Sequence, residues 1–211
     1  PGVWPNTAVV VAMAEKAIVL VGKFLKRAVK DGNDLEARDG MALAATLAGL
    51  ARDGGLYVPA ALPQLDADTI AGFSGRPYAE VAVEVIRPFV GDAIAEHDLA
   101  RMTREAYGHF RHPAVAPLTQ FGVSDFILEL FHGPTLAFKD LAMQLLARLM
   151  DQMLISRGER TTIVVATSGD TGGAAIEAFR GRARVDLFVL FPQGRVSDVQ
   201  RRMMTTAEED N

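Results

Sequence analysis

Apolar runs typical of buried strands alternate with helical segments in the second half of the sequence. Runs rich in β-branched or aromatic residues indicate strands at 125–131 (DFILELF), 161–167 (TTIVVAT) and 185–192 (VDLFVLFP). Segments with helical spacing lie between them, at 141–158 and 172–181, and each ends at a glycine. Strands that alternate with helices form a parallel sheet covered by helices. The predicted fold class is therefore α/β, a parallel sheet with helices on both faces.

The first half of the sequence has a different pattern. Residues 7–50 have helical periodicity, broken at KDGND, where Gly32 can end one helix and Asp34 can cap the next. A turn and a short strand follow in RDGGLYV, and nearby prolines prevent a helix there. We predict three parts: a helical segment at 1–46, a second segment at 47–112, and an incomplete α/β domain at 113–211.

Composition restricts the classes of partner. The chain has 211 residues, 49% hydrophobic and 23% charged, as expected of a soluble globular protein. A net charge of −4 gives no basic surface, so neither nucleic acid nor an anionic membrane is an expected partner. Glu15 and Lys16 interrupt the most apolar stretch before it reaches the ~20 residues needed to span a bilayer. The sequence contains no cysteine, which fits a reducing compartment, and we expect a cytoplasmic protein.

One strand runs directly into a glycine-rich loop that opens a helix, in IVVATSGDTGGAAIEAF (163–179). At such a junction the unpaired N–H groups of the first helical turn favour an anion, and glycines let the ligand approach the backbone. The predicted anion-binding residues are Ser168, Gly169, Asp170, Thr171 and Gly172. The loop has neither the lysine of a P-loop nor the spacing of a dinucleotide-binding motif. A capped turn without a ligand is the alternative interpretation.

A single lysine, Lys139, lies between a Gly-Pro turn and a long apolar helix in FHGPTLAFKD (131–140). An amine must be neutral to attack an aldehyde, and apolar surroundings favour the neutral form. A lysine of this kind can hold a cofactor as a Schiff base. The alternative is a lysine whose stem packs on apolar neighbours while its charged head reaches water.

These two motifs occur together with others in a fixed order. The segments GLARDGGLYVPAALP, ELFHGPTLAFKD, TSGDTGGAA and FPQGRVSDVQRRMMTT resemble threonine synthase, a pyridoxal-phosphate enzyme of fold type II. The resemblance covers roughly residues 47–211 and implies part of that fold. Relatives that make cysteine or tryptophan typically have asparagine where this chain has Asp170, which favours threonine synthase within the superfamily.

The resemblance implies a reaction and a set of roles. The family converts O-phosphohomoserine and water into threonine and phosphate, with pyridoxal phosphate as the electron sink. By this likeness Lys139 holds the cofactor and shuttles protons, with Phe138 beside it. The Ser168–Gly172 loop faces the cofactor, and Ser168 and Thr171 face the substrate carboxylate. Further candidates for anion or cofactor contacts are Arg195, Arg201, Arg202 and His132, although a solvated helix and a structural histidine explain them as well. No metal site is predicted, because His97, His109 and His112 lack the spacing of metal ligands.

Two features depart from the family pattern and leave alternatives open. Residues 7–50 resemble a helical segment of iron-containing alcohol dehydrogenases, without that family's metal-binding histidines. A complete threonine synthase is also much longer, and its glycine-rich loop for the cofactor phosphate belongs to a part beyond residue 211. The chain can therefore be an inactive fragment or fusion module that pairs with another chain. Another fold type II enzyme, such as a threonine dehydratase or cysteine synthase, is the third alternative. The sequence leaves the oligomeric state open.

Overall fold

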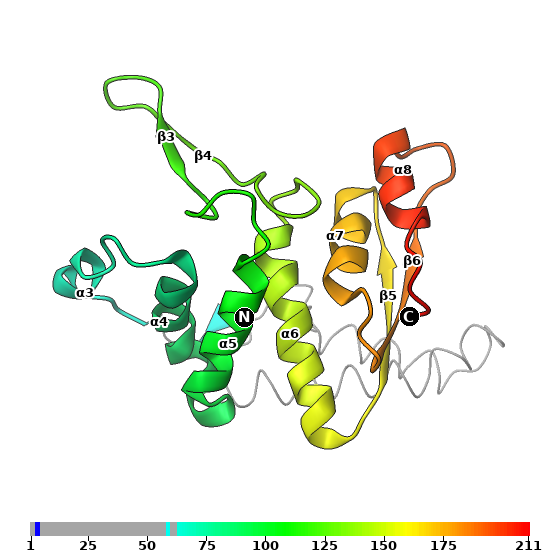
Figure 1. Ribbon diagram of the computed structural model, residues 1–211, viewed down its shortest axis with the longest axis horizontal. Helices are drawn as coiled ribbons and strands as arrows, with labels where there is room; N and C mark the ends of the chain where they lie inside the picture. The colour runs from blue at the N-terminus through cyan, green and yellow to red at the C-terminus, as the bar shows by residue number, and fades with distance from the viewer. Residues whose placement is uncertain (1–2, 5–57, 60–62) are drawn as a thin grey trace.

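A computed structural model describes residues 3–4, 58–59 and 63–211 of the chain (Figure 1). The helical segment predicted for 1–46 lies outside the described residues except at positions 3 and 4. There β1 (Val3–Trp4) pairs in parallel with β2 (Val58–Pro59). The short strand predicted in RDGGLYV is therefore confirmed at its last residue, Val58.

Three helices precede the candidate site. Helix α3 (Ala67–Ala71) begins at Asp66, whose carboxylate accepts a hydrogen bond from the Thr69 N–H at 2.7 Å. Helix α4 (Tyr78–Val90) ends at Gly91, which has a φ of 52°, and the 3₁₀ helix η1 (Gly91–Ala93) leads into α5 (Glu96–Tyr107). Helices α4 and α5 pack against each other and form one side of the molecule (Figure 1).

Helix α6 (Asp140–Arg157) lies between two apolar clusters, which explains why apolar residues occur on more than one of its sides. On one side Leu145 packs with residues of α4 and α5. On the other side Ala147 and Leu154 pack with residues of α7 and β6. The helix ends at Gly158, where the backbone adopts the left-handed conformation with a φ of 66°, so the predicted C-terminal glycine is confirmed.

The parallel part of the predicted sheet is confirmed in β5 (Thr161–Ala166) and β6 (Val185–Leu190), which pair in parallel over their whole length. Helix α7 (Asp170–Phe179) connects them, as expected for a parallel pair. Ile163 and Leu187 face α6 and α7. The other face exposes the large side chains of Phe188 and Leu190, at 58% and 60%. Helices therefore cover one face of this sheet in the described residues, whereas the sequence predicted both.

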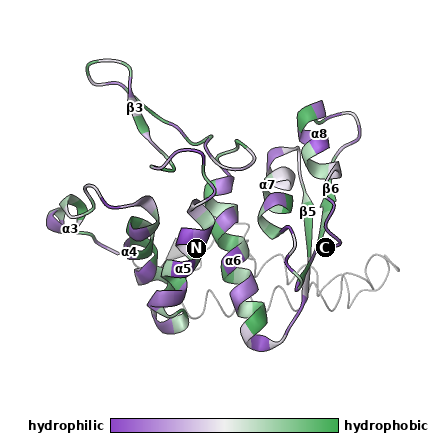
Figure 2. Cartoon of the chain, in the orientation of Figure 1, coloured by the Kyte–Doolittle hydropathy of each residue, from purple (hydrophilic) through white to green (hydrophobic). Residues whose placement is uncertain are grey.

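The strand predicted at 125–131 forms as β4 (Phe126–Leu128), but its place in the parallel sheet is contradicted. It pairs antiparallel with β3 (Leu118–Gln120) in a hairpin that projects from the body (Figure 1). Every residue of both strands is exposed, including Leu118, Ile127 and Leu128 at 61%, 51% and 54%. Figure 2 shows apolar residues along this hairpin. Isolated two-stranded hairpins are only marginally stable in water, so burial of these apolar side chains would stabilise this one.

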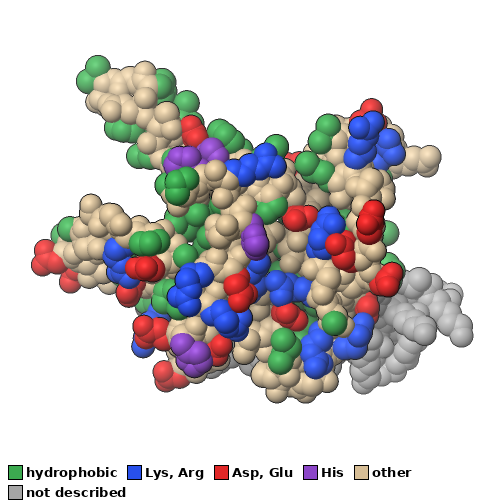
Figure 3. Space-filling view, in the orientation of Figure 1, with side chains coloured by type: hydrophobic (Ala, Val, Ile, Leu, Met, Phe, Trp, Pro, Cys, Tyr) green, Lys and Arg blue, Asp and Glu red, His purple; other side chains and the backbone are tan. Residues whose placement is uncertain are grey.

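Charged side chains of both signs are spread over the surface of the described part (Figure 3). On the face shown in Figure 3, positive and negative side chains are interspersed over the helices. Within the described ranges, no helix combines the length and apolarity required to cross a bilayer. The same residues contain no group of three or more histidine, aspartate or glutamate side chains arranged to hold a metal ion.

Helix α8 (Asp198–Thr205) follows β6 after the loop 191–197 and packs against α7. It begins with a capping box, in which the Ser197 hydroxyl accepts the Gln200 N–H and the Gln200 side chain accepts the Ser197 N–H. This cap fixes the first turn of α8 and the direction of the Gln200 side chain.

Candidate functional site

The loop that carries the candidate lysine is fixed by a buried carboxylate at the start of α6. Asp140 is completely buried, and its two oxygens accept hydrogen bonds from the N–H and hydroxyl of Thr135 at 2.8 and 2.7 Å. A Cβ at Gly133 would overlap the Asp140 side chain, so this glycine allows the close approach. Burial raises the pKa of Asp140, and the Thr135 hydrogen bonds oppose this rise.

Lys139 is the residue immediately before α6, and it is half-buried. Its carbonyl accepts the Met143 N–H at 2.9 Å, and its Nζ lies 4.5 Å from the centroid of the Phe138 ring. Leu136 has a φ of 64°, a strained conformation for a non-glycine residue that turns the chain toward Lys139. Phe138 and Leu136 are 58% and 48% exposed, so the apolar surroundings predicted for Lys139 form an open surface.

In the loop between β5 and α7, some backbone N–H groups are hydrogen-bonded and others are unpaired among the described residues. The Thr167 hydroxyl accepts hydrogen bonds from the N–H groups of Gly169 and Gly172, at 3.0 and 3.1 Å. The N–H groups of Asp170 and Thr171 have no hydrogen-bond partner in the part of the chain that the structure describes, as expected for the first turn of a helix. Those two groups are the ones available to an anion.

Helix α8 closes this loop from the outside. The Gln200 side-chain Nε2 donates a hydrogen bond to Asp170 Oδ1 at 2.7 Å. Gly169 has a φ of 146°, and a Cβ at this position would overlap the Gln200 amide. Glycine at position 169 therefore allows both the positive φ and the close contact with the Gln200 side chain of α8.

The two motifs singled out in the sequence meet in one narrow pocket with a volume of about 10 Å³. The lysine loop contributes Thr135 and Ala137, the start of α7 contributes Gly169, Asp170 and Gly173, and α8 contributes Gln200 and Met203. Lys139, Phe138, Ser168, Thr171 and Gly172 are not among its lining residues. A Cβ at Gly172 would contact Thr167, Met204 and Val189, so this glycine packs toward β6 and α8.

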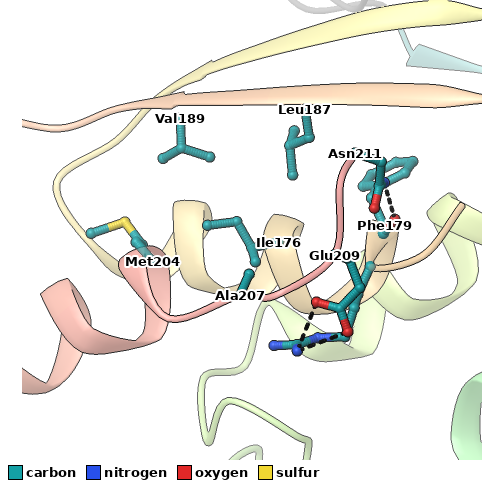
Figure 4. Close-up of a pocket in the computed structure, with 9 residues that line it drawn as sticks. Ile176, Phe179, Leu187, Val189, Met204, Ala207, Glu209 and Asn211 are labelled. Atoms are coloured by element: carbon teal, nitrogen blue, oxygen red, sulfur yellow. Dashed lines mark hydrogen bonds and ion pairs between the residues drawn. The ribbon is translucent and has the colours of Figure 1, made fainter.

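A larger cavity of about 160 Å³ lies elsewhere, between α7, β6 and the segment that follows α8 (Figure 4). Its inner wall is apolar, with Ile176 and Leu187 facing each other, and the Arg180–Glu209 ion pair closes one side. None of the predicted site residues lines it. We assign the candidate site to the smaller pocket, because segments of both motifs line it together with the polar side chains of Thr135, Asp170 and Gln200.

The candidates predicted from the sequence around α8 were the charged residues, whereas the two α8 residues that line the pocket are Gln200 and Met203. Arg195, Arg201 and Arg202 are exposed, and Arg201 lies 3.7 Å from the Asp198 carboxylate. Gln200 and Met203 are three residues apart and lie on the helix face toward α7. The capping-box pattern of Ser197 and Gln200 was the available signal for α8, but it does not indicate what the helix packs against.

His132 lies near the lysine loop and is held by a carboxylate. Its Nε2 is 2.6 Å from Glu129 Oε2, and Glu129 Oε1 accepts a hydrogen bond from the Thr119 hydroxyl at 2.8 Å. These hydrogen bonds, from His132 first, lower the pKa of Glu129 below its ordinary value of 4.5. The pair ties the end of β4 to the loop, which agrees with the structural interpretation of His132.

The lowered pKa of Glu129 predicts a pH-dependent contribution to stability. A carboxylate with a depressed folded-state pKa stabilises the fold above its unfolded pKa of 4.5, and this contribution is lost as pH falls through the lowered value. We therefore expect Glu129→Gln to be less stable than the parent at about pH 6, with the difference shrinking as pH falls below 4.5. Urea unfolding at several pH values measures this difference. A gap that does not change with pH would contradict the assignment.

Comparison with known proteins shows which proteins this chain is similar to. Residues 36–107 match the family model described as the threonine synthase N terminus. A threonine synthase from Pseudomonas aeruginosa is 57% identical over 165 residues, which are 78% of this chain and 35% of that protein. This chain is similar to the N-terminal third of threonine synthases. A threonine synthase from Schizosaccharomyces pombe is 41% identical over 176 residues, 79% of this chain and 34% of its own length.

Solved threonine synthase structures share the fold. The pyridoxal-phosphate-bound threonine synthase from Brucella melitensis has a TM-score of 0.72 and 63% identity, over 78% of this chain and 36% of its own. The yeast threonine synthase has a TM-score of 0.70 and 39% identity. The chain thus spans about a third of the length of the threonine synthases it matches. The partial fold type II fold predicted from the motifs is confirmed.

The likeness to a second family is also confirmed at the N-terminus. Residues 4–53 match the model of the C-terminal part of the Fe-containing alcohol dehydrogenase family. This match overlaps that of the threonine synthase N terminus between residues 36 and 53, a range that includes the sequence LAGLA (47–51).

Proposed function

We propose that this chain supplies the lysine-bearing part of a threonine synthase, which converts O-phosphohomoserine and water into threonine and phosphate. The observation that carries the proposal is the pocket in which the Thr135–Ala137 loop, the start of α7 and α8 meet. The identity of 57% to a threonine synthase supports it.

The residues present fit pyridoxal phosphate as the cofactor. An aldehyde cofactor requires an amine, and Lys139 is half-buried next to an aromatic ring. An anionic ligand requires donors, and the N–H groups of Asp170 and Thr171 are unpaired in the described residues. When bound, the cofactor supplies an electron sink for negative charge at the substrate Cα. We propose that Lys139 holds it through Nζ and that Phe138 and the 168–172 loop lie beside it.

The chain's own groups then have separate tasks. Lys139 moves a proton at the substrate Cα, because its half-buried amine lies in the loop proposed to hold the cofactor. The loop with Ser168 and Thr171 binds the substrate carboxylate through its unpaired N–H groups. Contacts of Arg195, Arg201 and Arg202 with the substrate phosphate stay a prediction. Cytoplasmic location and the lack of nucleic-acid and membrane partners also stay predictions from the sequence.

A site built from these residues needs further protein around it. The apolar residues beside Lys139 are exposed, and the hairpin and one face of the β5–β6 sheet are uncovered in the described part. The matched threonine synthases have about two thirds of their length beyond the matched region. We propose that the corresponding part of a threonine synthase covers these surfaces and completes the cofactor site, including the group that binds the cofactor phosphate.

The test compares two proteins, the 211-residue chain and an extended chain. The extended chain is the full sequence followed by the part of the Pseudomonas aeruginosa threonine synthase that lies beyond the matched region. We expect phosphate release from O-phosphohomoserine with the extended chain and pyridoxal phosphate, and little with the 211-residue chain. Formation of 2-oxobutanoate from threonine, or of cysteine from O-acetylserine and sulfide, in place of phosphate release would favour the other fold type II enzymes. An inactive extended chain that binds no cofactor would favour the inactive fragment.

A further inference from the structure

Gln200 connects the first turns of two helices. Its Oε1 accepts the Ser197 N–H at 3.0 Å, which caps α8, while its Nε2 donates to Asp170 Oδ1 at 2.7 Å, in the first turn of α7. An amide is required for both contacts, because one needs an acceptor and the other a donor. The absence of a Cβ at Gly169 leaves the space in which this amide lies.

The contact decides where the Asp170 carboxylate lies. A carboxylate in the first turn of a helix is attracted to the free N–H groups there. In this structure the Asp170 carboxylate does not cap α7, although Asp170 is its first residue; the Thr167 hydroxyl accepts the Gly172 N–H in that turn. Asp170 is instead hydrogen-bonded to Gln200, and the N–H groups of Asp170 and Thr171 stay unpaired in the described residues.

We infer that Gln200 is a positioning residue, which holds the Asp170 carboxylate away from the unpaired N–H groups of α7 and keeps them open to the substrate carboxylate. The inference rests on the proposed function, since it concerns the same 168–172 loop and its binding of the substrate carboxylate. It also explains why a negative residue is tolerated at an anion-binding turn. Without the Gln200 donor, Asp170 would occupy the donors that the substrate needs.

The decisive variant is Gln200→Glu in the extended chain. Glutamate keeps the acceptor for the Ser197 N–H, so the cap of α8 is retained. It also places a second carboxylate against that of Asp170. Because the two negative charges repel each other, the Asp170 side chain turns toward the α7 N–H groups. We expect KM for O-phosphohomoserine to rise about tenfold, with kcat within about threefold of the parent. Gln193→Glu adds the same charge at an exposed position and serves as the matched control, with KM unchanged.

The rescue variant separates positioning from general damage. Combining Gln200→Glu with Asp170→Asn returns the local charge to that of the parent and reverses the hydrogen bond, because the asparagine amide donates to the new carboxylate. We expect the double variant to bring KM back to within about threefold of the parent. A KM that stays raised in the double variant would overturn the inference, as would a normal KM in Gln200→Glu.

A cofactor-independent measurement uses the 211-residue chain itself. NMR spectra should contain one Gln200 side-chain amide proton that exchanges slowly with water, and Asp170→Ala should remove this protection because it removes the acceptor. Fast exchange in the parent would overturn the inference. A different result would contradict the proposed function: a parent extended chain that neither binds pyridoxal phosphate at Lys139 nor releases phosphate. That result would also remove the basis of the inference about Gln200.

Discussion

Replacement of Lys139 by alanine is expected to lower kcat/KM for phosphate release by the extended chain by about 10³-fold or more. The change removes the amine that holds the cofactor and moves the proton. Stability should change little, because the side chain is only half-buried and makes no side-chain hydrogen bond in the described residues. Steady-state kinetics and circular dichroism on the same samples measure both effects.

Two controls test this prediction: substitution of a different lysine, and addition of a free amine to the Lys139→Ala variant. Lys30→Ala changes a lysine in the segment without site motifs and should keep the parent rate. Added methylamine should restore part of the activity of Lys139→Ala, because it replaces the missing amine. A Lys139→Ala variant with the parent rate would remove Lys139 from the chemistry.

Asp140→Ala is expected to reduce the free energy of unfolding by about 2 to 4 kcal/mol, the largest stability effect anticipated in the site. Asp140 is completely buried, and its loss leaves two Thr135 donors without their acceptor. The space against Gly133 would also become a void. Urea unfolding of the 211-residue chain measures the change.

Two variants make the Asp140 prediction specific. Asp92→Ala, at an exposed position of η1, should change the free energy of unfolding by less than about 0.5 kcal/mol. Asp140→Asn keeps one acceptor oxygen and should lie between the parent and Asp140→Ala. Equal stability of Asp92→Ala and Asp140→Ala would show that the buried carboxylate does not fix the lysine loop.

Local patterns predicted the elements around the site well. The apolar runs at 161–167 and 185–192 form β5 and β6, and Gly158 ends α6 as its position predicted. Strand β4 was found, but its partner was not, because periodicity records which face is apolar and not which strand lies alongside. The open faces of the hairpin and of β5–β6 have the composition of buried strands, so the sequence predicted cover that the described residues do not provide.

The sequence indicated which motifs belong to the candidate site, but not which side chains contact each other there. The lysine loop and the α7 turn were expected to act together, and both contribute to one pocket. Gln200 was missed because its role depends on α8 folding back onto α7, a contact between residues 30 apart in the chain. Charge drew attention to Arg201 and Arg202, whereas the side chain that reaches Asp170 is neutral.

The most direct test of the account locates the cofactor on the chain. The extended chain is incubated with pyridoxal phosphate, reduced with borohydride, digested, and its modified peptides are mapped by mass spectrometry. The account predicts that Lys139 is the labelled lysine among the five of this chain, the others being Lys16, Lys23, Lys26 and Lys30. A label on any of those four, or an unlabelled Lys139 in an active enzyme, would contradict it.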